Sequence, residues 1–424
     1  MFIYEVLSAC LNMKKFIKYF FYIKKNKYYL RIYLFGICIY NSLKRVLFIN
    51  PENHFFEESN PIAILDIAQY LRYRGIKVDV CEYKNLPINS QYDLIGISCV
   101  SSYGGEIFNQ LEKIRKNFPF SKIVIGGKWS TTMLPEDKIK LKTLNINVEI
   151  NKAELVYTGD EKIDFKKYPS WNKKDFDILY KRDQIMTSRG CPFNCNFCNN
   201  TEEKINYFSV KRTVDNIELV LQKRENVYFV DDVFVTNFEH AKSIYDECKR
   251  RNINIENHNH FFVHLNTVNE NTIKLIQLYK PNFIEVGIES GDDRILKLMN
   301  KKTSTDKIRK TLPLLSKYTQ IYALWIVGYP YETIESLENS YKLAVEMQQY
   351  IEFSWVSHYI PLFGTEGYKM AKESGGQFLE ISNNKTISFI PKGLTSNTLI
   401  EYRKRIMELN KSNYYFKKCK MEDI

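Results

Sequence analysis

Three cysteines in one short segment are the residues of this chain best suited to metal chemistry. Cys191, Cys195 and Cys198 lie within residues 188–200 and have the spacing C-x3-C-x2-C. Cysteine thiolates are the usual ligands of iron–sulfur clusters. Three thiolates this close can hold three irons of one 4Fe–4S cluster. The fourth iron would then be open to a ligand that the protein does not supply.

A structural zinc site is the alternative for these cysteines. Such sites usually have four ligands, often arranged as two C-x2-C pairs. Here no histidine follows the third cysteine closely, and the next cysteine is Cys248. The spacing therefore favours an iron–sulfur cluster over zinc or a chance grouping, although it is not unique to clusters.

The cysteine segment resembles the signature of the radical S-adenosylmethionine (radical SAM) enzymes, C-x3-C-x-aromatic-C, with Phe197 at the aromatic position. Four further segments resemble these enzymes, in the order in which the family has them: residues 229–234, 285–291, 327–333 and 360–365. The resemblance implies that the open iron binds the amino and carboxylate groups of S-adenosylmethionine (SAM). One electron then breaks a C–S bond, and a 5′-deoxyadenosyl radical abstracts hydrogen from the substrate.

The resemblance also implies contacts to the methionine and ribose parts of SAM. Asp231 and Asp232 end a predicted strand, and at least one of them would accept hydrogen bonds from the methionine ammonium. Helix capping or a solvated turn is the alternative for this pair. Glu289 and Ser290 end another predicted strand and would reach the ribose hydroxyls, unless they cap the helix that follows.

Gly328 and Pro330 are the expected contacts to the adenine part of SAM, because glycine lets a ligand approach the backbone closely. Two positions depart from the family pattern. Tyr331 replaces the glycine that often follows this proline, which puts the shape of the turn in doubt. His264 stands where related enzymes often have arginine. Its spacing to the two preceding histidines is not a specific metal-ligand pattern, so we expect ordinary barrel histidines.

Residues 181–376 alternate between short apolar runs and helical patterns. The runs predict six strands, at residues 184–188, 226–230, 260–264, 283–287, 322–327 and 353–357. Helices are predicted between them at residues 214–223, 238–250, 271–279, 305–316 and 334–350. This alternation predicts a partial, TIM-like (β/α)6 barrel with its active site at the carboxyl ends of the strands.

Residues 44–150 show a second alternation. Strands are predicted at residues 45–49, 77–81, 94–98 and 122–127, with helices at 61–74 and 105–118, which indicates a Rossmann-like parallel sheet. The region resembles the cobalamin-binding module of radical SAM enzymes. The cobalt-ligand run Asp-x-His-x-x-Gly is absent around His54, so cobalamin binding stays open. The Gly126–Gly127 pair predicts either close approach of a ligand or a tight turn.

The rest of the chain is divided by composition. Residues 1–43 form a basic, aromatic extension that accounts for much of the net charge of +12. It is either a membrane-surface helix or an upstream translation without function. Residues 151–180 are a predicted linker, and residues 377–424 are a tail without a second cysteine cluster. The remaining scattered cysteines suit a reducing cytoplasm.

The sequence therefore predicts a cytoplasmic radical SAM enzyme that functionalises a C–H bond of a small molecule or peptide. Bound cobalamin would favour C-methylation. A reducing electron donor such as flavodoxin or ferredoxin is implied. One alternative is a cobalamin-free peptide or natural-product maturase, and another is a non-catalytic metal-binding or nucleic-acid-binding protein. The pI alone does not support nucleic-acid binding, and membrane association, the substrate and catalytic residues other than these ligands are left open.

Overall fold

The structure is a computed structural model of the chain. It describes residues 21–25, 30–34, 37–41, 45–51, 62–88, 90–99, 106–127, 129–130, 133–148, 164–179, 183–199, 204–379 and 387–411. His54, the first part of the predicted linker and the end of the predicted tail lie outside these residues.

The amino-terminal half of the described chain is a parallel sheet covered by helices on both faces. Its strands are β4 (Arg45–Asn50), β5 (Lys77–Glu82), β6 (Leu94–Ser98), β7 (Lys122–Gly126) and β8 (Ile146–Val148), in the order β5-β4-β6-β7-β8. The helices are α2 (Ile62–Tyr73), α3 (Glu106–Asn117) and α5 (Pro135–Thr143). We call this unit the N-domain. The order reverses between β4 and β6, where sheets of this topology bind ligands beyond the strand ends.

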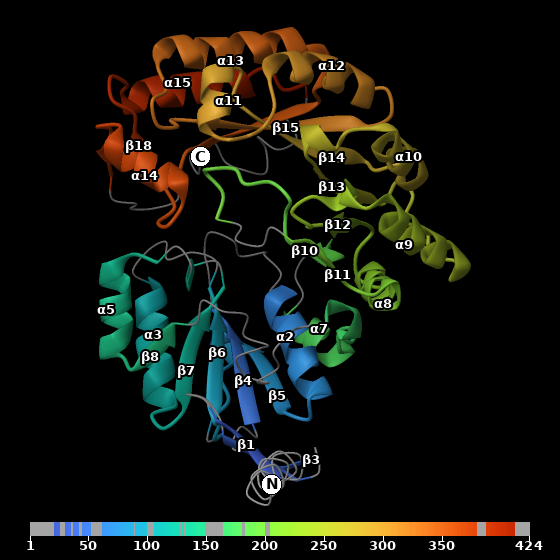
Figure 1. Cartoon of the computed structure of the whole chain (residues 1–424), viewed down its shortest axis with the longest axis vertical. Coiled ribbons are helices and arrows are strands. Elements are labelled where there is room, and N and C mark those ends of the chain that lie inside the picture. Colours follow the sequence, from blue (N-terminus) through green and yellow to red (C-terminus); the bar gives the residue numbers. More distant parts are fainter. Residues whose placement is uncertain are drawn as a thin grey trace, which may run out of the picture.

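The carboxyl-terminal half contains the six expected parallel strands. They are β9 (Gln184–Ile185), β12 (Val227–Phe229), β13 (Asn259–Val263), β14 (Phe283–Glu289), β15 (Gln320–Val327) and β16 (Phe353–His358). The sheet order is β16-β15-β14-β13-β12-β9, so neighbours in sequence are neighbours in space and the two edge strands do not pair. The predicted open barrel is confirmed (Figure 1).

Helices cover the outer face of this barrel. They are α8 (Val210–Leu221), α9 (Phe238–Arg250), α10 (Glu270–Tyr279), α11 (Asp293–Leu298), α12 (Thr305–Leu315), α13 (Ile334–Met347), α14 (Glu366–Glu373) and α15 (Ser396–Met407). Burial alternates along the strands, and in β15 every second residue from Ile321 to Val327 is buried. This period of two turns one apolar row of each strand toward the helices, and the other row lines the concave interior.

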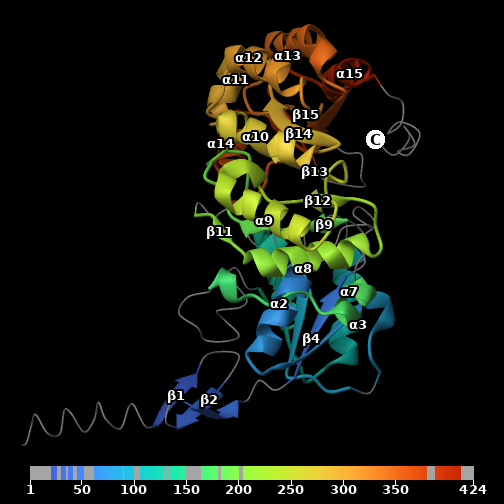
Figure 2. The same cartoon turned by 90° about the vertical axis from the view of Figure 1, so that its right-hand side faces the viewer.

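Smaller elements connect and extend the two units. They are α7 (Lys173–Leu179), the pair β10 (Ser188–Arg189) and β11 (Asn206–Tyr207), the pair β17 (Gln377–Phe378) and β18 (Phe389–Ile390), and the short 3-10 helices Tyr83–Asn85, Phe165–Lys167, Phe234–Thr236, Leu265–Thr267 and Gln348–Tyr350. The carboxyl ends of the N-domain strands point toward the barrel and toward the segment that carries the cysteines (Figures 1 and 2). The site is therefore to be sought where the two units meet.

The described part of the amino-terminal extension is a three-stranded antiparallel sheet. Its strands are β1 (Phe21–Lys25), β2 (Leu30–Leu34) and β3 (Ile37–Asn41). The sheet lies beyond the end of the N-domain that faces away from the barrel (Figure 2). The interpretation of this segment as a membrane-surface helix is therefore wrong for these strands. Among the described residues, no helix has the length and apolar character needed to cross a bilayer.

Candidate functional site

The cysteines lie on a loop, residues 190–199, that we call the cluster loop. Its centre is fixed through Asn196. The side-chain amide of Asn196 donates to the carbonyl of Leu298 at 2.8 Å, and its backbone N–H donates to the carbonyl of Met299 at 2.9 Å. The backbone N–H of Gly367 donates to the carbonyl of Asn196 at 2.7 Å. A Cβ on Gly367 would collide with the hydroxyl of Tyr359, so α14 approaches the loop only because residue 367 is glycine.

The three thiols differ in environment. Cys191 and Cys195 are partly buried and Cys198 is exposed. Burial raises the pKa of Cys195 to about 11, against a lowering by Lys301, and burial also raises the pKa of Cys191. Metal coordination would have to displace these protons, since cysteine binds metals as the thiolate.

The donor set fits a cluster whose irons are bound one by one. Among the residues that the structure describes, no three Cys, His, Asp or Glu side chains converge as the ligands of a single metal ion would. Cysteines that each bind a different iron of a 4Fe–4S cluster need not meet at one point. Sulfur ligands without a nearby histidine or carboxylate also suit iron–sulfur chemistry. We therefore take the loop as the candidate cluster site.

The two aspartates at the end of β12 face different surroundings. Asp231 is fully buried, and its carboxylate accepts hydrogen bonds from the backbone N–H of Thr187 at 3.0 Å and from the hydroxyl of Ser188 at 2.5 Å. Burial raises the pKa of Asp231 to about 6, although these donors lower it. Asp232 is exposed, and its charge acts on Cys191. Asp231 thus holds the strand that leads into the cluster loop, and Asp232 is the member of the pair on the open side.

Glu289 forms a buried ion pair that the sequence did not reveal. Its Oε1 lies 2.7 Å from the Nζ of Lys301, and the two residues are only 8% and 5% exposed. Burial alone would lower the pKa of Lys301, but Glu289 and Cys195 outweigh it and raise the pKa. A Cβ on Gly287 would collide with this pair, so a glycine in β14 makes room for it. The pair therefore places a fixed cation within electrostatic reach of Cys195.

Ser290 is fully buried behind the strand end. Its hydroxyl lies 3.2 Å from that of Ser340 and accepts from the backbone N–H of Asp292 at 3.2 Å. These contacts match the alternative in which Ser290 supports the start of the following helix. Glu289 and Ser290 therefore occupy different environments, although they are adjacent in sequence.

The predicted adenine contacts lie in a tight turn after β15. Gly328 has φ = +87° and its N–H donates to the buried carboxylate of Glu332 at 2.5 Å. Tyr331, at the position that departs from the family, has φ = +64°, a conformation that usually favours glycine. Pro330 is buried in this turn. Phe197 packs, partly buried, against a group of apolar residues: Ile295, Met299, Tyr329, Tyr359, Ala371 and Phe389.

His264 contacts the cluster loop directly. Its ring stacks on Phe193 with centroids 3.6 Å apart, and its Nδ1 accepts from the N–H of Asn266 at 3.1 Å. Burial, with Lys301 and Lys307, lowers the pKa of His264 to about 3. The imidazole is thus neutral near pH 7, unlike the arginine common at this place, and the cation of this region is Lys301.

The N-domain edge was tested for a ligand cradle. Gly127 has φ = +89°, and a Cβ there would collide with the carbonyl of Cys99. The N–H of Trp129 donates to the same carbonyl at 3.1 Å. These contacts favour the tight-turn interpretation of the Gly126–Gly127 pair. The strand order still leaves a crevice between the ends of β4 and β6, as binding modules of this topology have.

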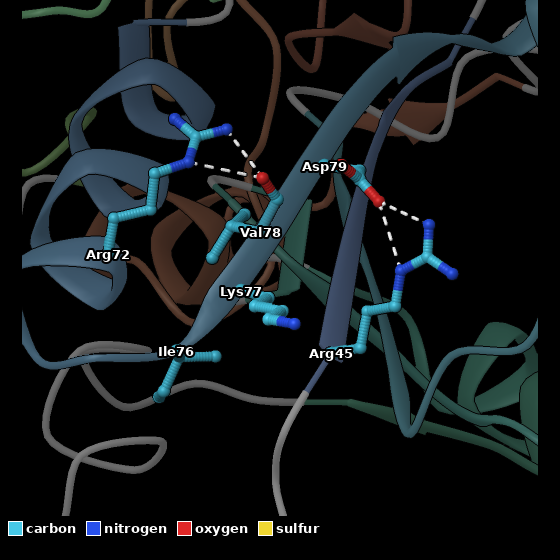
Figure 3. A pocket seen from close by; sticks show the side chains of 6 residues that line it. All are labelled: Arg45, Arg72, Ile76, Lys77, Val78 and Asp79. Atoms are coloured by element: carbon cyan, nitrogen blue, oxygen red, sulfur yellow. Dashed lines mark hydrogen bonds and ion pairs between the residues drawn. The ribbon is translucent and has the colours of Figure 1, made fainter.

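A cavity of about 620 Å³ lies at the opposite end of the N-domain, lined by Arg45, Arg72, Ile76, Lys77, Val78 and Asp79 (Figure 3). Its arginines are already paired: Arg45 with Asp79 at 2.9 Å, and Arg72 with the carbonyl of Val78 and with Asp175. This cavity therefore offers little uncompensated charge to a ligand, and it lies far from the cysteines.

Sequence patterns missed Lys301, Asn196 and Gly367. Each is an ordinary residue type that acts through a partner distant in sequence, so no local spacing marks it. The only available signal was indirect: Lys301 follows a short helix after the Glu289 segment, in a region that the motifs already placed near the site.

Comparison with known proteins identifies the carboxyl-terminal half. Residues 185–344 match the model of the radical SAM superfamily. An uncharacterised methyltransferase of Pyrococcus horikoshii is 29% identical over 201 residues, 43% of each chain. The anaerobic magnesium-protoporphyrin IX monomethyl ester cyclase of Rubrivivax gelatinosus is 26% identical over 186 residues, 41% of this chain and 32% of the cyclase. The chain thus spans less than half the length of these relatives.

Solved structures resemble both halves together. The radical SAM methyltransferase TsrM of Kitasatospora setae, determined with cobalamin and a 4Fe–4S cluster, has a TM-score of 0.60 at 15% identity and 85% coverage of each chain. The cobalamin-dependent SAM radical enzyme OxsB has a TM-score of 0.66 at 15% identity, over 94% of this chain and 77% of OxsB. These likenesses establish the fold.

Proposed function

This chain belongs to the radical SAM superfamily, and from that premise we propose that it cleaves SAM reductively at a 4Fe–4S cluster held by Cys191, Cys195 and Cys198. The observation that carries the proposal is the position of the three cysteines. They lie on one loop, anchored by α11 and α14, at the carboxyl end of an open parallel barrel. Active sites of barrels of this kind lie at that end.

The chain's own residues would bind and orient SAM. A bound cluster supplies the electron that breaks the sulfonium C–S bond. The ammonium of the methionine group is suited to Asp232, which is exposed beside the loop. The carboxylate is suited to the cation of Lys301, held in place by Glu289. Asp231, with both oxygens occupied by Thr187 and Ser188, positions the loop rather than the ligand.

Glu289, Gly328, Pro330 and Phe197 remain our candidates for the ribose and adenine side. Ser290 is the weakest of the predicted contacts, because its hydroxyl is buried against Ser340. The tight turn at Gly328 presents backbone rather than side chain, which suits a flat ring that approaches closely.

We further propose cobalamin-dependent methyl transfer to carbon as the reaction. The support is the N-domain sheet order, with its crevice directed toward the cluster loop, as in TsrM and OxsB by overall fold. The cobalamin contacts of those enzymes are not transferred to this chain. A small-molecule or peptide substrate and a reducing protein such as flavodoxin or ferredoxin belong to the same proposal.

The test is anaerobic reconstitution with iron and sulfide, followed by dithionite and SAM, with and without methylcobalamin. We expect about four irons per chain and formation of 5′-deoxyadenosine in the native protein. Cys195→Ala should lose deoxyadenosine, whereas the control Cys248→Ala, a buried cysteine of α9, should keep it. Zinc in place of iron, or an intact cluster with no SAM cleavage, would refute the proposal.

Cobalamin is tested separately, because the radical proposal does not depend on it. Binding is followed by the visible absorbance of methylcobalamin, and methyl transfer by the label of methyl-labelled SAM. Bound cobalamin supports the methyltransferase proposal. Deoxyadenosine without cobalamin binding would instead favour the cobalamin-free maturase.

A further inference from the structure

The strand that leads into the cluster loop is held by two buried carboxylates from different parts of the molecule. Asp231 of the barrel accepts from Thr187 and Ser188, as described above. The next residue, Arg189, donates from Nη2 to the Oδ2 of Asp66 at 3.1 Å. Asp66 belongs to α2 of the N-domain, 123 residues away in sequence. Three consecutive residues before Gly190 and Cys191 are therefore each anchored.

Asp66 is the centre of a buried network at the junction of the two units. Its side chain is 0% exposed. Besides Arg189, it pairs with Arg212 of α8, whose side chain is 1% exposed, and accepts from the indole N–H of Trp171 at 2.7 Å. The amino end of α2 lies beside α8 in both views (Figures 1 and 2). One carboxylate of the N-domain thus meets two guanidinium groups of the barrel half.

Aromatic rings complete the enclosure. The guanidinium of Arg212 lies 3.6 Å from the ring centroid of Phe208. The guanidinium of Arg189 lies 5.7 to 5.8 Å from the rings of Phe165, Tyr168 and Phe208. Such faces favour cations, but rings cannot replace the full charge of a carboxylate. Asp66 is therefore the main anionic partner of these arginines, and its loss would leave buried positive charge uncompensated.

We propose that Asp66 is a positioning residue that couples the N-domain to the cluster: by holding Arg189 it sets the position of the cluster loop and the charge beside the cluster. This inference rests on the proposed function. Arg189 is only two residues before Cys191, so their Cα atoms lie within about 7 Å of one another. A change of one charge at this distance acts appreciably on a reduction step, since the protein interior screens weakly.

The sign of the effect follows from the charges. Reduction adds one negative charge to the cluster. Asp66→Asn removes a negative charge and leaves Arg189 and Arg212 less compensated, so reduction should become easier. Arg189→Met removes a positive charge and keeps the Asp66–Arg212 pair, so reduction should become harder. We expect about three- to tenfold shifts of the reduction equilibrium, where tenfold corresponds to 59 mV for one electron.

Asp175→Asn is the matched control. Asp175 is also a buried carboxylate, 3% exposed, that pairs with an arginine of α2. Its partner Arg72 lies six residues beyond Asp66, about 9 Å farther along the helix, where its guanidinium donates to Val78 (Figure 3). This variant disturbs the same helix without touching the cluster loop, so the potential should stay native.

The experiment is an EPR-monitored redox titration of the native protein and the three variants, each reconstituted anaerobically, with the EPR change on adding SAM as a second readout. Opposite shifts in Asp66→Asn and Arg189→Met, with a native potential in Asp175→Asn, support the coupling. Native potentials in both, or equal shifts in all three variants, would overturn it. If Asp66→Asn does not fold, the downward shift in Arg189→Met decides alone.

The two proposals can fail separately. A native protein that forms no reducible cluster refutes the proposed function. A native protein with a working cluster that is insensitive to Asp66 and Arg189 refutes only the coupling.

Discussion

The Lys301–Glu289 pair offers a quantitative test of the site. The two charged atoms lie 2.7 Å apart and both residues are almost completely buried. Lys301→Met keeps the length of the side chain but leaves the Glu289 carboxylate buried without its cation. Breaking such a pair typically costs about 3–5 kcal/mol, so we expect the free energy of unfolding of the cluster-free protein to fall by that amount.

The charge left behind should account for most of this loss. Adding Glu289→Gln to Lys301→Met removes the uncompensated charge, so the double variant should be more stable than Lys301→Met by about 2 kcal/mol. Glu289 has φ = +65°, and glutamine shares its backbone preferences, so the second change adds little new strain. The assay is urea-induced unfolding followed by circular dichroism, under reducing conditions without iron.

An exposed pair provides the control. Lys369 and Glu366 lie 2.8 Å apart, but their side chains are 64% and 53% exposed. Lys369→Met should leave stability unchanged within error, because water and salt screen exposed pairs. Equal losses in Lys301→Met and Lys369→Met, or a double variant no more stable than Lys301→Met, would contradict the argument from burial.

Three further predictions concern the loop and the turn beside it. Asp231→Asn should lower the iron bound after reconstitution, because Thr187 and Ser188 lose a charged acceptor, whereas Asp232→Asn should bind native iron and respond to SAM only at higher concentration; the reverse pattern would contradict our division of the pair. Gly367→Ala should reduce iron loading, measured by metal analysis, since a Cβ would displace Asn196 and Tyr359, and full loading would show that the loop tolerates the shift. Burial raises the pKa of Glu332 to about 8, above its usual 4.5, so its stabilising contribution is present at low pH and lost as pH rises through 8. Thermal unfolding at pH 5 and pH 9 should therefore show native protein losing stability relative to Glu332→Gln, and parallel curves would refute the shift.

The sequence predicted the secondary structure well where apolar periodicity was strong. The strands β6 and β7 and the helix α9 fall within one residue of the predicted ranges. Parallel strands also followed, because strand and helix alternate. The strand β8 was missed because its three residues are too few to show a period. The extension was misjudged as a helix because its aromatic and basic residues suit either conformation.

Part of the candidate site was visible in the sequence. The cluster cysteines are close in the chain, so their spacing alone states the chemistry that they can perform. The two aspartates after β12 were also placed at the correct end of a strand. What the sequence could not do was divide their roles, since adjacent residues on a strand end point to opposite sides.

The sequence by itself determined the cysteine triad, the two parallel α/β units and their order, because these depend on patterns within a few dozen residues. Only the tertiary structure decided which charges meet. Lys301 finds Glu289, Asp231 finds Ser188, and Asp66 reaches Arg189 across 123 residues. Such partners are selected when burial removes water and leaves each charge to the nearest group of opposite sign. That selection depends on packing between distant segments, and no local pattern encodes it.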